Sequence, residues 1–172
     1  MTTATSLHQI IVPPPALELP EALQQKILAC TIKYPKVRSG LLAALYEVQH
    51  HYGFVPEGAM GPVADIFGLG ASDVQGVVSF YTMYYRQPVG KFVLQFCRTL
   101  PCHLRGAGDL REEILKELGL KIGETSKDGL FTAMEIECIG ACSDAPAMLV
   151  NDDLHDNLTG EKIRNLISQL RA

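Results

Sequence analysis

Apolar residues in the first half of the chain recur every three or four positions, which is the spacing of an amphipathic helix. Four such stretches succeed one another between residues 20 and 86, and glycine or proline separates them. Short helices joined by short loops predict a small helical bundle over residues 20–88. The first expected helix runs from Pro20 to Tyr34-Pro35, and the second from an N-cap on Ser39 to Gly53. The third runs from Pro56 to Gly68, and the fourth from a capping box in Ser72–Gln75 to Tyr81.

The aromatic residues at the end of this region have two interpretations. Phe80-Tyr81 and Tyr84-Tyr85 are expected to form helix core, and contact with a partner protein is the alternative.

The N-terminal segment differs from the rest of the chain. Val12-Pro13-Pro14-Pro15 holds three successive prolines, which are incompatible with a helix interior. Residues 1–19 are therefore predicted to be an extended, mobile arm.

After Gln87-Pro88-Val89-Gly90 the period changes from helical to alternating. Strands are predicted over 92–97, 130–137 and 147–151, and a turn at Asp152-Asp153 leads into a short fourth strand. One helix is expected after Cys102 and another after an N-cap at Thr159. A helical crossover makes the first two strands parallel, and a hairpin makes the last two antiparallel. The prediction is an α+β or α/β domain over residues 89–172, with a mixed sheet close to a thioredoxin-like layout.

Composition narrows the function classes. The 172 residues are 47% hydrophobic and 20% charged, with a net charge of −4, which argues against a basic nucleic-acid-binding surface. The sequence has no apolar run long enough to span a bilayer, and residues 1–11 do not read as a signal peptide. We therefore expect a cytoplasmic protein, in which thiols stay reduced and clustered cysteines more often bind metal than form disulfides.

Four of the five cysteines form two close pairs, Cys97-x4-Cys102 and Cys138-x3-Cys142. Each pair follows a predicted strand, and the carboxyl ends of parallel strands meet at one edge of a sheet. We therefore expect four thiolates around one metal centre. The N-terminus of the helix after Cys102 is expected to stabilise thiolate there. A left-handed Gly140 would let backbone N–H groups approach sulfur.

The spacing leaves alternatives open. Four cysteines also suit zinc in a structural domain. A thiol–disulfide oxidoreductase typically uses C-x-x-C, a spacing that neither pair has. Cys30 lies on the apolar face of the first predicted helix and is expected to be a buried small hydrophobe. His103 is expected to be a surface or neighbouring group rather than a ligand.

Several motifs together carry a resemblance to a known family. The chain resembles the thioredoxin-like [2Fe–2S] ferredoxin subunit of the NADH dehydrogenase module of respiratory complex I, and related subunits occur in NAD-linked hydrogenases and formate dehydrogenases. The resemblance covers about residues 20–172 and rests on Cys97-x4-Cys102, Asp128-Gly-Leu-Phe131, Glu137-Cys-Ile-Gly-Ala-Cys142, Ala145-Pro146, Asp153–Thr159, Gly53-Phe-Val-Pro56, Val77–Tyr81 and Arg86–Gly90.

The resemblance implies that Cys97, Cys102, Cys138 and Cys142 ligate one [2Fe–2S] cluster. It implies an electron-transfer subunit of an NADH:quinone oxidoreductase without a catalytic substrate pocket of its own. FMN and NADH are expected on a partner subunit, and other peripheral-arm iron–sulfur subunits are further expected partners. The complex would lie peripherally on the cytoplasmic side of the membrane, with no insertion of this chain. Whether the Ala145-Pro146 bond is cis stays open, since thioredoxin-like folds often place a cis-proline near their site.

Overall fold

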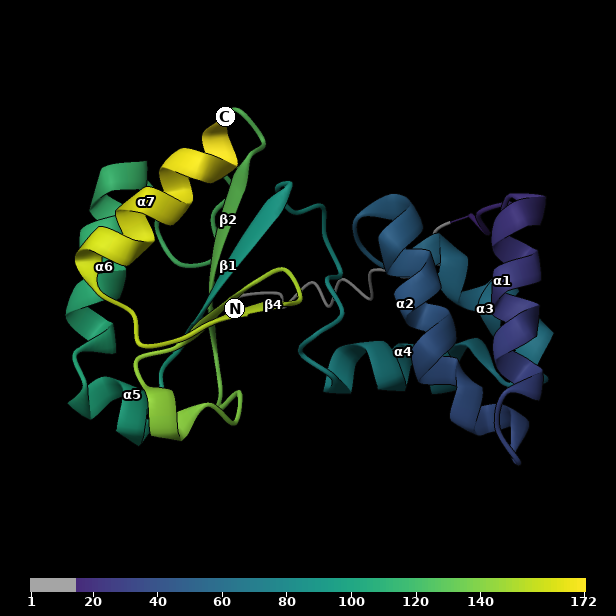
Figure 1. Ribbon diagram of the computed structural model, residues 1–172. Coiled ribbons are helices and arrows are strands. Elements are labelled where there is room, and N and C mark those ends of the chain that lie inside the picture. The colour runs from purple at the N-terminus through teal and green to yellow at the C-terminus, as the bar shows by residue number, and fades with distance from the viewer. Residues whose placement is uncertain (1–14) are drawn as a thin grey trace, which may run out of the picture. The chain divides into compact units, whose positions relative to one another are not determined.

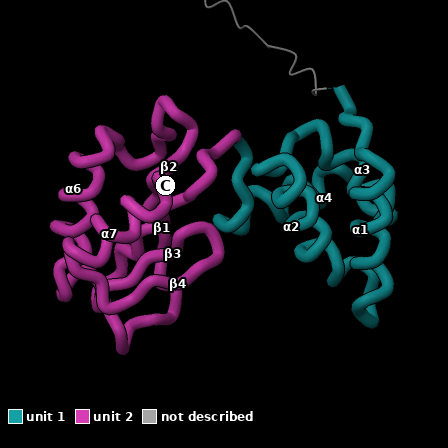
Figure 2. Tube along the Cα trace, turned by 45° about the horizontal axis from the view of Figure 1, so that its top comes forward, with its two compact units in different colours: residues 1–87 teal, residues 88–172 magenta. Residues whose placement is uncertain are grey.

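The computed structural model describes residues 15–172, so most of the predicted arm lies outside the described residues. The chain divides into two compact units, residues 1–87 and 88–172 (Figure 2). At the end of the predicted arm, Leu17 and Leu19 contact the helical unit, and the mobility of residues 1–19 stays a prediction. The Leu17 N–H donates to the Gly58 carbonyl at 2.8 Å, and Leu19 is only 4% exposed within the helical core.

The first unit is a bundle of short helices, as the periodicity predicts. Its elements are α1 (Glu21–Ile32), the 3₁₀ helix η1 (Val37–Gly40), α2 (Leu41–Tyr52), α3 (Glu57–Phe67) and α4 (Ala71–Phe80) (Figure 1). The apolar faces meet in one core, to which Ile27, Leu45 and Val63 contribute fully buried side chains. Gly53 and Gly68 end α2 and α3 in the left-handed conformation, where glycine carries no penalty.

Two predicted helix starts are wrong in register. Ser39 lies inside η1, and Gly40 is the residue before α2. The fourth helix begins at Ala71 because the Asp73 carboxylate accepts the Gly70 N–H at 3.2 Å. A carboxylate three residues after Gly70 satisfies that free donor, so the helix starts earlier than a cap at Ser72 would place it.

The aromatic residues at the end of α4 and beyond it belong only in part to the helical core. The helix ends at Phe80, whose side chain is 77% exposed, so the prediction of helix core is wrong there. Tyr84 lies beyond the helix and is buried in the bundle, where its hydroxyl donates to the Leu42 carbonyl at 2.8 Å. Gln49 fixes the same segment, because its side chain donates to the Met83 carbonyl and accepts the Tyr85 N–H.

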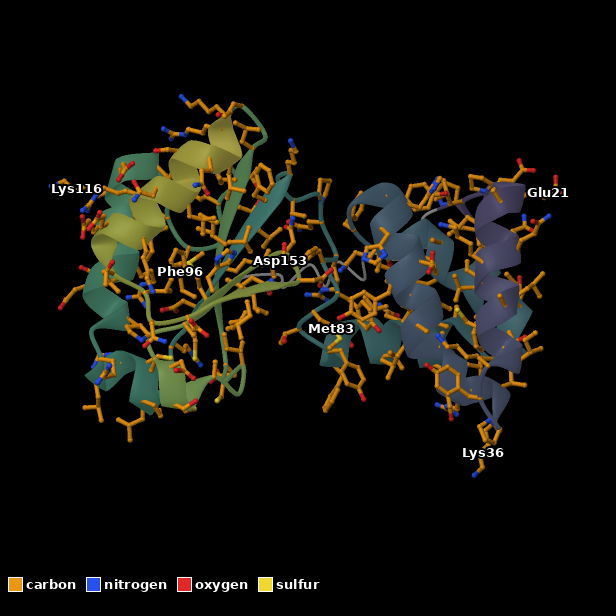
Figure 3. The ribbon with its side chains drawn as sticks, viewed as in Figure 1. Glu21, Lys36, Met83, Phe96, Lys116 and Asp153 are labelled. Atoms are coloured by element: carbon orange, nitrogen blue, oxygen red, sulfur yellow. The ribbon has the colours of Figure 1, made fainter. Side chains whose placement is uncertain are left out.

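The second unit contains a four-stranded mixed sheet in the order β2-β1-β3-β4. The central strand β1 (Phe92–Cys97) runs parallel to β2 (Phe131–Ile136) and antiparallel to β3 (Met148–Val150), and β3 pairs antiparallel with β4 (Asp153–His155). Helices α6 (Ala107–Leu118) and α7 (Gly160–Arg171) pack on one face of this sheet (Figure 1). Phe96 lies in the core between the sheet and these helices (Figure 3). The predicted strand directions are confirmed.

The connections within this unit differ in detail from the sequence prediction. The helix expected after Cys102 is two helices, α5 (Leu100–Leu104) and α6, separated by Gly106 with φ of 86°. Cys102 therefore lies inside α5 rather than before a helix. The cap on α7 is as predicted, since the Thr159 hydroxyl accepts the Lys162 N–H at 3.2 Å.

Candidate metal centre

The parallel pairing of β1 with β2 brings the two cysteine pairs to one edge of the sheet. Cys97 is the last residue of β1 and is paired in register with Ile136, the last residue of β2. Cys138 follows two residues later, and Cys142 begins the 3₁₀ helix η2 (Cys142–Asp144). All four cysteines are free thiols. The topology thus places every candidate ligand at the carboxyl ends of the same two strands.

The four thiols form an inner pair and an outer pair. Cys97 and Cys102 are 2% and 1% exposed and pack against Ala145 and Ala147. Cys138 and Cys142 are exposed, with their sulfurs 3.5 Å apart. The inner pair therefore faces the protein interior, and the outer pair faces solvent.

The bond between Ala145 and Pro146 is cis. The loop that contains it lies directly after η2 and leads into β3, and its Ala145 and Ala147 are the residues that cover the inner cysteine pair.

Each pair contains one thiol with a lowered pKa and one with a raised pKa. Burial raises the pKa of Cys97, but hydrogen bonds from the Thr99 hydroxyl and backbone N–H outweigh it, so the pKa lies below its ordinary value. The pKa of Cys138 is lowered, first by the Gly140 N–H and then by its contact with Cys142. Burial raises the pKa of Cys102, and the hydrogen bond with Cys138 raises that of Cys142.

Backbone N–H groups lower the pKa of three of the cysteine thiols. The Gly140 N–H donates to Cys138 Sγ at 3.4 Å, and Gly140 has a φ of +83°, as the sequence predicts. The Ile139 N–H contributes to the lowered pKa of Cys97, and the Ala147 N–H partly offsets the raised pKa of Cys102. Such N–H donors stabilise thiolate and tune the potential of a group that the thiolates hold.

One electrostatic prediction for this site is wrong. A helix N-terminus was expected to favour thiolate at Cys102, yet its pKa is raised because the sulfur is buried. Cys102 is the third residue of a five-residue helix, and burial dominates there.

Sequence reasoning also missed two polar contributors beside the cysteines. Thr99 lies between Cys97 and Cys102, and its hydroxyl oxygen is 3.2 Å from the Cys97 sulfur. Arg98 directly follows Cys97, and its Nε donates at 2.9 Å to Glu137, which directly precedes Cys138. A hydroxyl and opposite charges next to the cysteines were the available signal. The contact between Arg98 and Glu137 depends on the parallel register of β1 and β2.

The remaining candidates are a cysteine in the helical unit and a histidine next to Cys102. Cys30 is buried in the helical core as predicted, with its sulfur donating to the Lys26 carbonyl. His103 is exposed on α5. Within residues 15–172, no three His, Cys, Asp or Glu side chains are gathered closely enough to hold a single metal ion.

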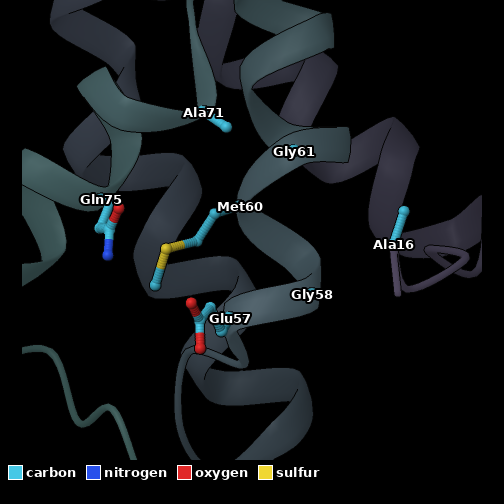
Figure 4. Close-up of a pocket in the computed structure, with 7 residues that line it drawn as sticks. All are labelled: Ala16, Glu57, Gly58, Met60, Gly61, Ala71 and Gln75. Atoms are coloured by element: carbon cyan, nitrogen blue, oxygen red, sulfur yellow. The ribbon is translucent and has the colours of Figure 1, made fainter. Parts of the chain in front are cut away.

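The helical unit has a hollow of about 190 Å³ beside α3 and α4 (Figure 4). Glu57 is the one ionisable side chain among the residues that line it, so the hollow provides no acid–base pair. None of the helices in the described part of the chain combines the length and the apolar character needed to cross a bilayer.

The donor set fits a two-iron cluster. A [2Fe–2S] cluster takes four cysteine thiolates, and its potential depends on hydrogen bonds to sulfur and on solvent exposure. The site supplies four free thiols in two pairs, backbone N–H donors to the sulfurs, and both buried and exposed positions.

Comparisons with known proteins agree with this fit. The family described as thioredoxin-like [2Fe–2S] ferredoxin matches residues 27–171. The chain is 37% identical over 156 residues to the E subunit of the NADH-quinone oxidoreductase of Escherichia coli (strain K12), covering 91% of this chain and 94% of that protein. It is 36% identical over 152 residues to the corresponding E subunit from Aquifex aeolicus (strain VF5), covering 88% and 95%.

A solved structure shows the same fold. The H2-reduced NAD+-reducing [NiFe]-hydrogenase matches 77% of this chain with a TM-score of 0.67 and 23% identity, and the match spans 22% of the hydrogenase chain. With the family match over most of both units and the fitting donor set, the chain belongs to the thioredoxin-like [2Fe–2S] ferredoxin family.

Proposed function

We propose that this chain is the [2Fe–2S] electron-transfer subunit of an NADH:quinone oxidoreductase. The observation that carries the proposal is the convergence of two cysteine pairs at the shared carboxyl edge of β1 and β2. The relatives that match nearly the whole chain are E subunits of NADH-quinone oxidoreductases, so the chain is part of a multi-subunit complex.

The four ligands in this proposal are Cys97, Cys102, Cys138 and Cys142. When bound, the cluster supplies reversible one-electron transfer. Cys97 and Cys102 hold its buried side, where Ala145 and Ala147 exclude water. The backbone N–H groups that point at the sulfurs balance the negative charge of the thiolates.

The outer pair gives the site its route to a redox partner. Cys138 and Cys142 are exposed, so a partner surface can approach this side closely. The partner in this proposal is a flavin- and NADH-binding subunit of the same complex, which carries FMN and oxidises NADH, with further iron–sulfur subunits beyond it. The chain would lie on the cytoplasmic side of the membrane.

In this proposal the chain has two functional parts. Residues 89–172 form the ferredoxin domain, which contains every cysteine of the metal centre. Residues 20–88 form a helical domain that contributes no ligand and offers exposed apolar side chains such as Phe80 for contacts within the complex.

The ligand assignment is tested by single cysteine substitutions with an internal control. Cys138→Ser and Cys142→Ser alter exposed residues, so neither is expected to disturb the core. Each should abolish or strongly reduce the visible absorbance and the iron content of the purified chain. Cys30→Ala removes a cysteine from the helical core and should retain both. A Cys138→Ser protein with the full wild-type spectrum would contradict the assignment.

The host complex is tested separately by affinity isolation of the tagged full-length chain from its own cells. Copurification of an FMN-containing, NADH-oxidising subunit together with quinone reductase activity would support the proposal. Copurification of a nickel–iron subunit with NAD-linked hydrogenase activity would instead place the chain in a hydrogenase, whose fold it shares.

A further inference from the structure

The hydroxyl of Thr99 contacts the sulfur of a cysteine in the inner pair. Its oxygen lies 3.2 Å from the sulfur of Cys97, and the hydroxyl also contributes to the lowered pKa of Cys138. Thr99 belongs to the first cysteine loop, whereas Cys138 follows the neighbouring strand. A side chain that is not a candidate ligand therefore lies at the level of the sulfurs.

The adjoining helix does not use this hydroxyl. Thr99 occupies the N-cap position of α5, where a threonine side chain ordinarily accepts an N–H from the first turn. In this chain the side chain makes no such bond. Its backbone is held on both sides, because the Thr99 carbonyl accepts the His103 N–H at 2.9 Å and the Thr99 N–H donates to the Cys97 sulfur. The β-branched side chain has little freedom, so the hydroxyl stays near the sulfurs.

The direction of the hydrogen bond follows from the chemistry of the acceptor. Once Cys97 is a thiolate, its sulfur has no proton to donate, so the Thr99 hydroxyl has to be the donor. A hydrogen bond strengthens as its acceptor becomes more negative. An electron added to the metal centre increases the negative charge on the sulfurs, so the bond stabilises the reduced state more than the oxidised state.

We infer that Thr99 is a positioning residue of the metal centre, whose hydroxyl donates to the Cys97 sulfur and raises the reduction potential of the group that the cysteines hold. This inference rests on the proposed function and adds to it a residue that is not a ligand. It concerns the side chain of Thr99 alone, since the N–H donors beside it persist in any substitution.

The test is a redox titration of the full-length chain carrying its cluster, followed by visible absorbance and EPR. Thr99→Val removes the hydroxyl and keeps the branched shape, and Thr99→Ser keeps the hydroxyl. Thr125→Val is a matched control, because Thr125 bonds to Thr132, which is paired with Val93 at the far end of β1 from Cys97.

We expect Thr99→Val to lower the reduced-to-oxidised ratio at a fixed applied potential by roughly threefold to tenfold, a shift of about 30 to 60 mV for one electron. The EPR g-values should change with it, which a purely structural role would not require. Thr99→Ser and Thr125→Val should titrate with the wild type.

A Thr99→Val potential equal to that of the wild type would overturn the inference, and so would an equal shift in Thr99→Ser. If both Thr99→Val and Thr99→Ala fail to hold the cluster while Thr99→Ser holds it, the hydroxyl is required beside the Cys97 sulfur, in support of the inference. Failure of Thr99→Ser as well would overturn it. A wild-type chain without a [2Fe–2S] cluster would refute the proposed function itself, whereas an unshifted Thr99→Val refutes only the role of Thr99.

Discussion

Gly140 offers a direct test of the loop geometry at the outer cysteine pair. Its φ is +83°, and a Cβ added to it would meet no heavy atom within 4 Å. The cost of Gly140→Ala is therefore a backbone cost and involves no steric clash with neighbouring groups. For an L-residue in the left-handed region this cost is roughly 1–2 kcal/mol. We expect the free energy of unfolding of the sheet-containing unit to fall by about that amount.

The assay is thermal unfolding of the cluster-free chain by far-UV circular dichroism and by tyrosine fluorescence. The chain has no tryptophan, and all six tyrosines lie between residues 34 and 85. Tyrosine fluorescence thus reports on the helical unit, while circular dichroism reports on both units. Gly140→Ala should lower the second unit's Tm by about 4–8 °C for each kcal/mol lost. The tyrosine transition should stay where it is.

A control in the same unit distinguishes backbone strain from a general effect of alanine. Gly108 lies inside α6, and its added Cβ would be 3.8 Å from His103 Nδ1, an ordinary contact. Gly108→Ala should raise stability by up to about 1 kcal/mol, because alanine favours helix. Gly140→Asn should cost less than Gly140→Ala, since asparagine tolerates positive φ. A Gly140→Ala protein as stable as the wild type would refute the reasoning.

Three further predictions concern the thiol of Cys138, the packing of Gly90 against backbone, and the buried hydroxyl of Tyr84. In the cluster-free chain near pH 7, iodoacetamide should modify Cys138 before Cys142, because the Gly140 N–H lowers the pKa of Cys138, whereas the hydrogen bond that the Cys142 thiol donates to Cys138 raises the pKa of Cys142. Peptide mass spectrometry showing the reverse order would contradict this. Gly90→Ala should destabilise the sheet unit by about 1–3 kcal/mol in denaturant titrations, because its Cβ would lie 2.9 Å from the Phe131 backbone, and an unchanged midpoint would contradict it. Burial raises the pKa of Tyr84 above its ordinary value, so the unfolded chain releases this proton first and stability should fall as pH rises above about 10. Tyr84→Phe should flatten that decline in thermal melts across this pH range, and a decline as steep as that of the wild type would count against it.

The elements and the strand directions were accessible from sequence because each follows from local periodicity and from the chirality of crossovers. Helix ends were less accessible, since several polar residues compete for the same free N–H groups. Asp73 satisfies the Gly70 N–H, and this contact moved the start of α4 away from Ser72. The exposure of Phe80 depends on where α4 ends, which the aromatic spacing alone does not encode.

The candidate site shows the same division between local and non-local information. The spacing of the cysteines, the strands before them and the left-handed Gly140 were all visible in the chain. The raised pKa of Cys102 was not, because its burial depends on Ala145 and Ala147, which arrive from a distant segment. The effect of Thr99 on the pKa of Cys138 likewise depends on the register of β1 and β2.

The central claim is tested most directly by purifying the full-length chain anaerobically and measuring its iron, acid-labile sulfide and zinc, with visible and EPR spectra before and after dithionite. The account predicts a brown protein with two irons and two sulfides per chain and a rhombic S = 1/2 signal on reduction. A colourless protein that contains one zinc ion and shows no EPR signal on reduction would contradict it.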